Sequence, residues 1–255
     1  MQAILALSEK SFRKAITSKI FVIFLLFAVG LIFLSILLEQ LTFTAKLKII
    51  KDVGLVSISI FTALLAIFLS GESIVGEIER KTVYLLFSKP VNKKNFILGN
   101  FLGIVWTVAL SLVTTGGILL LLVFLKQGYL EGGLFLALGF IGLESLVISS
   151  VGIMFSSFSS SSITATFLCF FVYILGHLFP QLNLLIRVLP SKIIKGFILV
   201  AVWILPNLEY FNIRGKVVKG EPIGFLYTGE IILYTLVYSG IMLFLAYIFF
   251  RRRQL

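Results

Sequence analysis

The chain has 255 residues, of which 59% are hydrophobic and 13% are charged, and its formal net charge is +11. Its long apolar runs exclude a soluble globular domain and predict a polytopic α-helical membrane protein, since a β-barrel would alternate over short segments. The basic residues lie mainly outside those runs, so the positive charge indicates topology and contact with anionic lipid rather than nucleic acid. We therefore expect one all-α domain in a lipid bilayer, with no nucleic-acid partner.

The N-terminal part of the chain predicts a surface helix followed by two membrane spans. Residues 1–19 place most apolar side chains on one helical face, which is typical of an amphipathic helix at the membrane interface. Residues 20–38 form a charge-free run long enough to cross a bilayer, and too long for a signal peptide, so this segment is expected to be retained. A second span is expected over 53–75, with Glu72 near its end.

A charged island interrupts the apolar chain after the second span, in the loop 76–95. Each such charge at the bilayer centre costs at least ~2.5 kcal/mol, so the island must lie in water at the membrane face. A patterned polar surface held between two spans suggests a docking site. The charged residues of the island are Glu77, Glu79, Arg80, Lys81, Lys89, Lys93 and Lys94.

Four further apolar runs predict the remaining spans. They cover residues 96–125, 134–155, 163–179 and 231–250. The first of these exceeds the ~20 residues that a crossing needs, so we expect it to include a surface elbow. Within it, Gly99 and Gly103 have the spacing that lets helices approach closely, either inside the subunit or between subunits.

Residues 180–230 are expected to form an external loop before the sixth span. Its apolar stretch 196–205 is too short to cross a bilayer, so a re-entrant or interfacial segment is favoured over a seventh span. Basic residues cluster beside the first span, in the island and at Arg251–Arg253. Six spans place all three clusters on one side, which predicts cytoplasmic termini in the cell inner (plasma) membrane.

The sequence contains no complete site for chemistry of its own. Gly71 and Gly76 have the spacing of a phosphate loop, but Glu77 stands where such a loop needs a lysine. One histidine and one cysteine form no metal or redox cluster, so no cofactor and no catalytic residue is expected on this chain.

Two acidic residues near or within the spans are candidate intramembrane polar sites. Glu144 lies near the middle of the fourth span, where a carboxylate is either functional or braced by nearby Ser or Thr. Glu72 is equally open to a structural pairing. His177 lies near the outer end of the fifth span and is expected at the interface.

Three segments of the chain have a recognisable pattern. They are GEIERKTVYLLFSKPVNKKNFILGNFLG, the serine-rich FSSFSSSS, and LPNLEYFNIRGKVVKGEP with a last span ending in FRRRQL. Together these segments resemble the permease subunits of type-two ATP-binding-cassette (ABC) transporters. They cover most of the chain in the family's order and look closest to permeases of multicopper-enzyme or nitrous-oxide-reductase maturation. Where many relatives have Gly before the Thr of the first segment, this chain has Lys81.

The resemblance implies a coupling helix at about 77–88 that docks into a separate ATPase subunit. Apolar anchors and polar contacts together are a usual docking mode, and Pro90 would end the helix. The polar contacts would be Glu77, Glu79, Arg80 and Lys81, and the anchors Val83, Tyr84, Leu85 and Leu86. The alternative from the residues alone is a surface helix resting on lipid headgroups.

The family further implies two copies of the permease, two ATPase subunits that bind ATP and Mg, and export of a substrate. Two other function classes stay open. One is a stand-alone carrier or integral membrane enzyme that uses Glu144, and the other is a membrane assembly factor without transport.

Overall fold

The structure is a computed structural model that describes residues 2–40, 46–81, 92–180 and 204–253. The described residues form helices and connections, without a strand, which confirms the all-α class. The helices are α1 Gln2–Ile16, α2 Lys19–Gln40, α3 Lys46–Ser73, α4 Val75–Glu79, α6 Lys93–Gln127, α7 Gly132–Phe158, α8 Ser162–His177, the 3₁₀ helix η1 Leu208–Phe211, α11 Arg214–Lys219 and α12 Phe225–Arg252.

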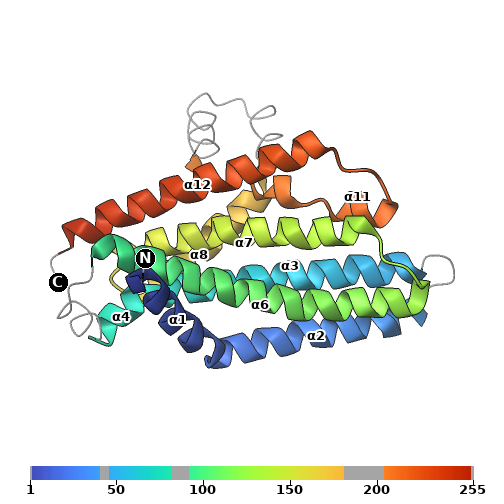
Figure 1. Cartoon of the computed structure of the whole chain (residues 1–255), viewed down its shortest axis with the longest axis horizontal. Helices are drawn as coiled ribbons and strands as arrows, with labels where there is room; N and C mark the ends of the chain where they lie inside the picture. Colours follow the sequence, from blue (N-terminus) through green and yellow to red (C-terminus); the bar gives the residue numbers. More distant parts are fainter. Residues whose placement is uncertain (1, 41–45, 82–91, 181–203, 254–255) are drawn as a thin grey trace, which may run out of the picture.

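The long helices run side by side in one bundle (Figure 1). Helices α3 and α7 are its centre, since each contacts several neighbours and most of its apolar window is buried. Among the described residues, five helical segments are long and apolar enough to cross a membrane. Helix α8 coincides with the predicted span 163–179 but has only 16 residues, about 24 Å at 1.5 Å per residue, against a hydrocarbon core of about 30 Å.

Helix α6 corrects the expectation of a surface elbow. It is one continuous helix of 35 residues, begun by the Asn92 side chain, which accepts from the Lys94 N–H, and ended at Gly128, whose φ is 80°. Its first turns pack against α1: a Cβ on Gly99 would lie 2.5 Å from the Leu7 Cβ. Because α1 covers those turns, the helix continues beyond the length of a span without bending. The glycine pair 99/103 therefore serves packing within the chain.

The two ends of the bundle carry different segments (Figure 1). Both termini and α4 lie at one end, and α11 lies at the other end with the connection between α6 and α7. Two ion pairs tie that second end: Lys51 Nζ lies 2.6 Å from Glu131 Oε1, and Lys126 Nζ lies 2.8 Å from Glu39 Oε2. Pairing offsets part of the cost of burying Lys51 and Glu39.

The predicted external loop 180–230 is described from residue 204 onward. Its η1 packs against both α7 and α8, and a Cβ on Gly176 would lie 2.8 Å from the Leu208 Cγ. The Asn207 N–H donates to the Tyr234 hydroxyl of α12 at 2.9 Å. This part of the loop therefore packs closely onto α8 and α12. Most of the apolar stretch 196–205 lies outside the described residues, so its re-entrant placement stays a prediction.

Candidate coupling site

The helix is interrupted between α3 and α4, and a serine of α7 binds the backbone at this interruption. The N–H groups of Ile74 and Val75 both donate to the Ser156 Oγ, at 3.1 and 3.0 Å. The first N–H groups of a helix have no partner inside the helix, so an outside acceptor is needed when they are buried, as here. Ser156 therefore fixes the start of α4 to the centre of the bundle.

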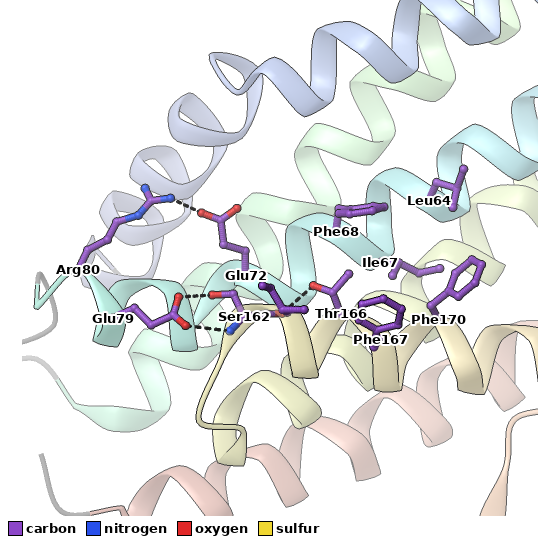
Figure 2. A pocket seen from close by; sticks show the side chains of 11 residues that line it. Leu64, Ile67, Phe68, Glu72, Glu79, Arg80, Ser162, Thr166, Phe167 and Phe170 are labelled. Atoms are coloured by element: carbon purple, nitrogen blue, oxygen red, sulfur yellow. Dashed lines mark hydrogen bonds and ion pairs between the residues drawn. The ribbon is translucent and has the colours of Figure 1, made fainter.

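The other end of α4 is fixed to α8 through Glu79. Its carboxylate accepts from the Ser162 N–H at 3.0 Å and from the Ser162 hydroxyl at 2.6 Å (Figure 2). Ser162 is the first residue of α8, where the helix dipole favours negative charge. Glu79 thus serves as an additional N-terminal cap for α8, supplied from a segment 83 residues away.

Two further ion pairs connect this region to α1 and α3. Glu77 is buried, with a side chain 6% exposed, and its Oε1 lies 3.4 Å from the Lys10 Nζ of α1. Arg80 Nη2 lies 2.5 Å from the Glu72 Oε1 of α3 (Figure 2). Glu72 is therefore structurally paired. Of the four polar contacts predicted for docking, three are exposed, whereas Glu77 faces the interior.

The helix predicted at 77–88 differs from the structure at its start, and the structure interrupts it after Glu79. Helix α4 already starts at Val75 and ends at Glu79, and Lys81 has a positive φ of 58°. This left-handed conformation costs a residue other than glycine roughly 1–2 kcal/mol, and it stops the helix. The same conformation also explains why many members of the family that the chain resembles have Gly at this position. The apolar anchors Val83, Tyr84, Leu85 and Leu86 lie outside the described residues, so the helix that contains them stays a prediction.

A groove of about 640 Å³ opens between α3 and α8 beside these contacts (Figure 2). Its walls are mostly apolar, with Phe68 on α3 and Phe167 on α8. Its rim at the α4 end is polar and consists of the Glu72–Arg80 pair and the Glu79–Ser162 contact. Because the same residues hold α4 and border the groove, a displacement of α4 would change the shape of that rim.

The serine-rich segment 155–162 supplies the partners of the α4 region on α7 and α8. Besides Ser156 and Ser162, its backbone carbonyls at Ser157 and Ser159 accept from Arg253 Nη1, at 3.4 and 3.0 Å. Sequence reasoning noticed this segment only through the family resemblance and missed these roles, as it missed Lys10. A run of serines directly after an apolar helix was the available signal.

Glu144 forms a second polar site, away from α4 and inside the bundle. Its Oε1 lies 3.4 Å from the Nε2 of His177, and its side chain is 6% exposed. His177 is the last residue of α8, as expected for the end of the fifth span, and its ring also lies beside Glu144 near the middle of α7. The expectation of Ser or Thr partners missed this pairing, because the two residues are far apart in sequence.

These features define a polytopic helical membrane protein whose best organised polar contacts gather around one short helix at a bundle end. The sequence matches the family model described as ABC-2 family transporter protein over residues 5–255. The chain belongs to this family and is the permease type of ABC-transporter subunit, a membrane transport component that associates with an ABC ATPase and is normally non-catalytic. The comparison with curated proteins returned no match.

Proposed function

We propose that the chain is the membrane-spanning subunit of an ATP-driven exporter and works as a dimer above two ATPase subunits. In this proposal α8 is the fifth of six spans, and both termini face the cytoplasm in the cell inner membrane. ATP and Mg bind to the ATPase partner. Export follows the family resemblance, as does the narrower likeness to permeases of copper-enzyme or nitrous-oxide-reductase maturation.

The observation that carries the proposal is the attachment of α4 to four other helices. Its residues and the turns beside it bind α1 through Glu77, α7 through Ser156, α8 through Glu79 and α3 through Arg80. The proposed docking segment at about 77–88 begins within this short helix and continues along the chain beyond it. A force applied there by an ATPase would reach four helices at once, which suits a rigid-body switch between two states.

The open groove between α3 and α8 supports the dimer. Its apolar walls and its volume of about 640 Å³ fall in the range of ligand-binding cavities, but it is open along one side in the single chain. A second copy facing this groove would enclose a pathway between the two chains. Exposed apolar residues on α2 and α12 leave those outer helices to contact lipid.

A stand-alone carrier or membrane enzyme remains the second candidate because of one contact. The Glu144 Oε1 lies 3.4 Å from the His177 Nε2 inside the bundle, and an intramembrane carboxylate beside an imidazole is the kind of site that such a protein would use. Such a protein would work without an ATPase partner, and so would an assembly factor without transport. Both alternatives are therefore separated from the exporter by one binding experiment.

We expect Leu85→Asp to abolish binding of the ATPase subunit, because an apolar anchor at a docking surface carries much of the energy. Co-purification of the ATPase with the tagged full chain should fall at least ~10-fold, which corresponds to about 1.4 kcal/mol. Glu77 is unsuitable for this test, since its carboxylate is buried against Lys10.

The matched control is Leu226→Asp, which changes an 81% exposed leucine in the first turn of α12, and this helix begins away from the α4 end of the bundle (Figure 1). This variant should bind the ATPase like the unaltered chain. Retention of the ATPase by Leu85→Asp would show that the docking assignment is wrong. Purification of the unaltered, active protein without any ATPase would instead favour the carrier or the enzyme.

A further inference from the structure

A second cavity lies at the α4 end, on the other side of α3 from the groove. It has a volume of about 420 Å³ and is enclosed by the turn between α1 and α2, the end of α3 and the first half of α6. Lys14 and Lys19 border it, together with the Glu72–Arg80 pair. Since Arg80 neutralises Glu72, the two lysines leave this cavity positive.

A buried amide in the cavity wall lacks the acceptor that it needs. Asn100 of α6 is 4% exposed, and its Nδ2 has no hydrogen-bond partner within the described parts of the chain. A buried donor without a partner costs about 1–3 kcal/mol. Such a group in a cavity wall points to a ligand that supplies an oxygen atom.

Lys14 shows the same shortage of an anion. It is partly buried, and no carboxylate of the described residues forms an ion pair with it within 4.0 Å. Burial lowers the pKa of its ammonium group, although Glu72 and Glu77 oppose that effect from a distance. A bound anion would supply the counter-charge directly.

The start of α2 adds a third attraction for an anion. Ser18, Lys19 and Ile20 border the cavity where this 22-residue helix begins. The Ser18 Oγ accepts from the Phe21 N–H at 3.2 Å, and the first N–H groups of a helix have no intrahelical partner. The positive end of the α2 dipole therefore lies at the wall of the cavity, a position that favours anions.

We propose that this cavity binds the phosphate of an anionic phospholipid headgroup. Its position favours a lipid over a free ion, because it lies between the amphipathic helix α1 and the beginning of the membrane-spanning helix α2. The volume of about 420 Å³ suits a headgroup rather than a whole lipid. The apolar side chains of Leu69 and Ile104 also border it and would meet the first carbons of the acyl chains. This site does not depend on the ATPase docking assignment.

Native mass spectrometry of the full chain, purified and delipidated in detergent, tests the site. With equal amounts of dioleoylphosphatidylglycerol and dioleoylphosphatidylcholine, the protein should retain one phosphatidylglycerol in at least ~10-fold preference. Lys14→Gln should remove this preference. Asn100→Asp should remove it too, since it puts a negative charge in the cavity wall at nearly constant shape.

The control is Arg13→Gln, on the same helix as Lys14 but exposed, paired with Glu9 and outside the cavity wall. It should leave the preference unchanged. Equal retention of the two lipids, or an unchanged preference in Lys14→Gln and Asn100→Asp, would overturn the proposal. So would an equal loss in Arg13→Gln, which would indicate diffuse attraction. Displacement of the lipid by millimolar inorganic phosphate would assign the cavity to a free anion instead.

Discussion

At the scale of single residues, Glu131 illustrates how one partly buried carboxylate supports a buried cation. Its Oε1 lies 2.6 Å from the Nζ of Lys51, whose side chain is 7% exposed, and 2.9 Å from the Nε2 of Gln127. The hydrogen bond from Lys51 holds the pKa of Glu131 below its ordinary value. A lowered folded-state pKa means that the stabilisation is present above the unfolded-state pKa of about 4.3 and is lost as the pH falls through the folded-state value.

Glu131→Gln should therefore destabilise the protein by about 1–3 kcal/mol at pH 7, because Lys51 would stay buried without its counter-charge. Thermal unfolding in detergent at several pH values measures this difference. The gap between the two proteins should narrow below about pH 4, where the wild-type carboxylate also loses its charge.

The control is Glu221→Gln, which alters an exposed carboxylate 4.0 Å from the Lys219 Nζ. A change within about 0.5 kcal/mol is expected there, because exposed ion pairs contribute little. A gap between wild type and Glu131→Gln that stays constant down to pH 3 would contradict the assignment.

Glu77 and Glu79 show what the sequence could not predict at this scale. Both were expected to contact a partner, but Glu77 is buried against Lys10 and Glu79 is exposed beside Ser162. Residues two apart on a helix point about 200° apart, so one five-residue helix cannot present both on one face. The charge pattern marked this segment as polar, while the direction in which each charge points depends on contacts with α1 and α8.

At the scale of elements, the break between α3 and α4 depends on Ser156. Ser156→Ala should lower the free energy of unfolding by about 1–3 kcal/mol, because the N–H groups of Ile74 and Val75 would lose their buried acceptor. The midpoint of thermal unfolding measures this loss. If α4 transmits movement, the same variant should also weaken stimulation of the ATPase by the permease.

Ser150→Ala is the matched control on the same helix. Ser150 is equally buried, but its hydroxyl donates to the Val147 carbonyl within α7, so no other element loses a partner. This variant should be clearly more stable than Ser156→Ala. Similar losses in the two variants would show that the Ser156 contact has no special role in holding α4.

The long helices could be predicted from the sequence because each corresponds to an apolar run of about the length of a bilayer. A helix lies over most of each predicted span, although α3 ends at Ser73 within the span predicted over 53–75 and α8 ends at His177 within the span predicted over 163–179. The surface elbow expected within 96–125 was wrong, since the apolar run alone does not show that α1 covers the first turns of α6. The end of α3 at Ser73 was missed for a similar reason. The Ile74 N–H that follows it donates to Ser156 of α7, which is 82 residues away in the sequence.

At the scale of the whole molecule, α4 and both ends of the chain lie at the same end of the bundle (Figure 1). This arrangement predicts that all three face the same side of the membrane. The chain has one cysteine, Cys169, and it is buried, so the unaltered protein offers a silent background for thiol labelling. Tyr129→Cys, at an exposed position between α6 and α7, should react in intact cells with a membrane-impermeant maleimide. Arg252→Cys, near the C-terminus, should react only after permeabilisation.

The unaltered chain is the control and should remain unlabelled in both conditions. Labelling of both variants in intact cells would place the two ends of the bundle on one side of the membrane, contrary to a spanning bundle. The reverse pattern, with Arg252→Cys labelled first, would invert the proposed orientation and place α4 away from any cytoplasmic ATPase.

The shortness of α8 has a mechanical consequence. At 16 residues it works as a stiff rod, with Glu79 seated on its first turn and η1 packed against its last. Because α8 also packs along its length against α3 and α7, a push at its first turn would move these helices together rather than slide α8 alone. A displacement at Glu79 would thus reach the Glu144–His177 contact at the other end of α8. The α4 contacts and the polar contact inside the bundle therefore belong to one mechanical unit.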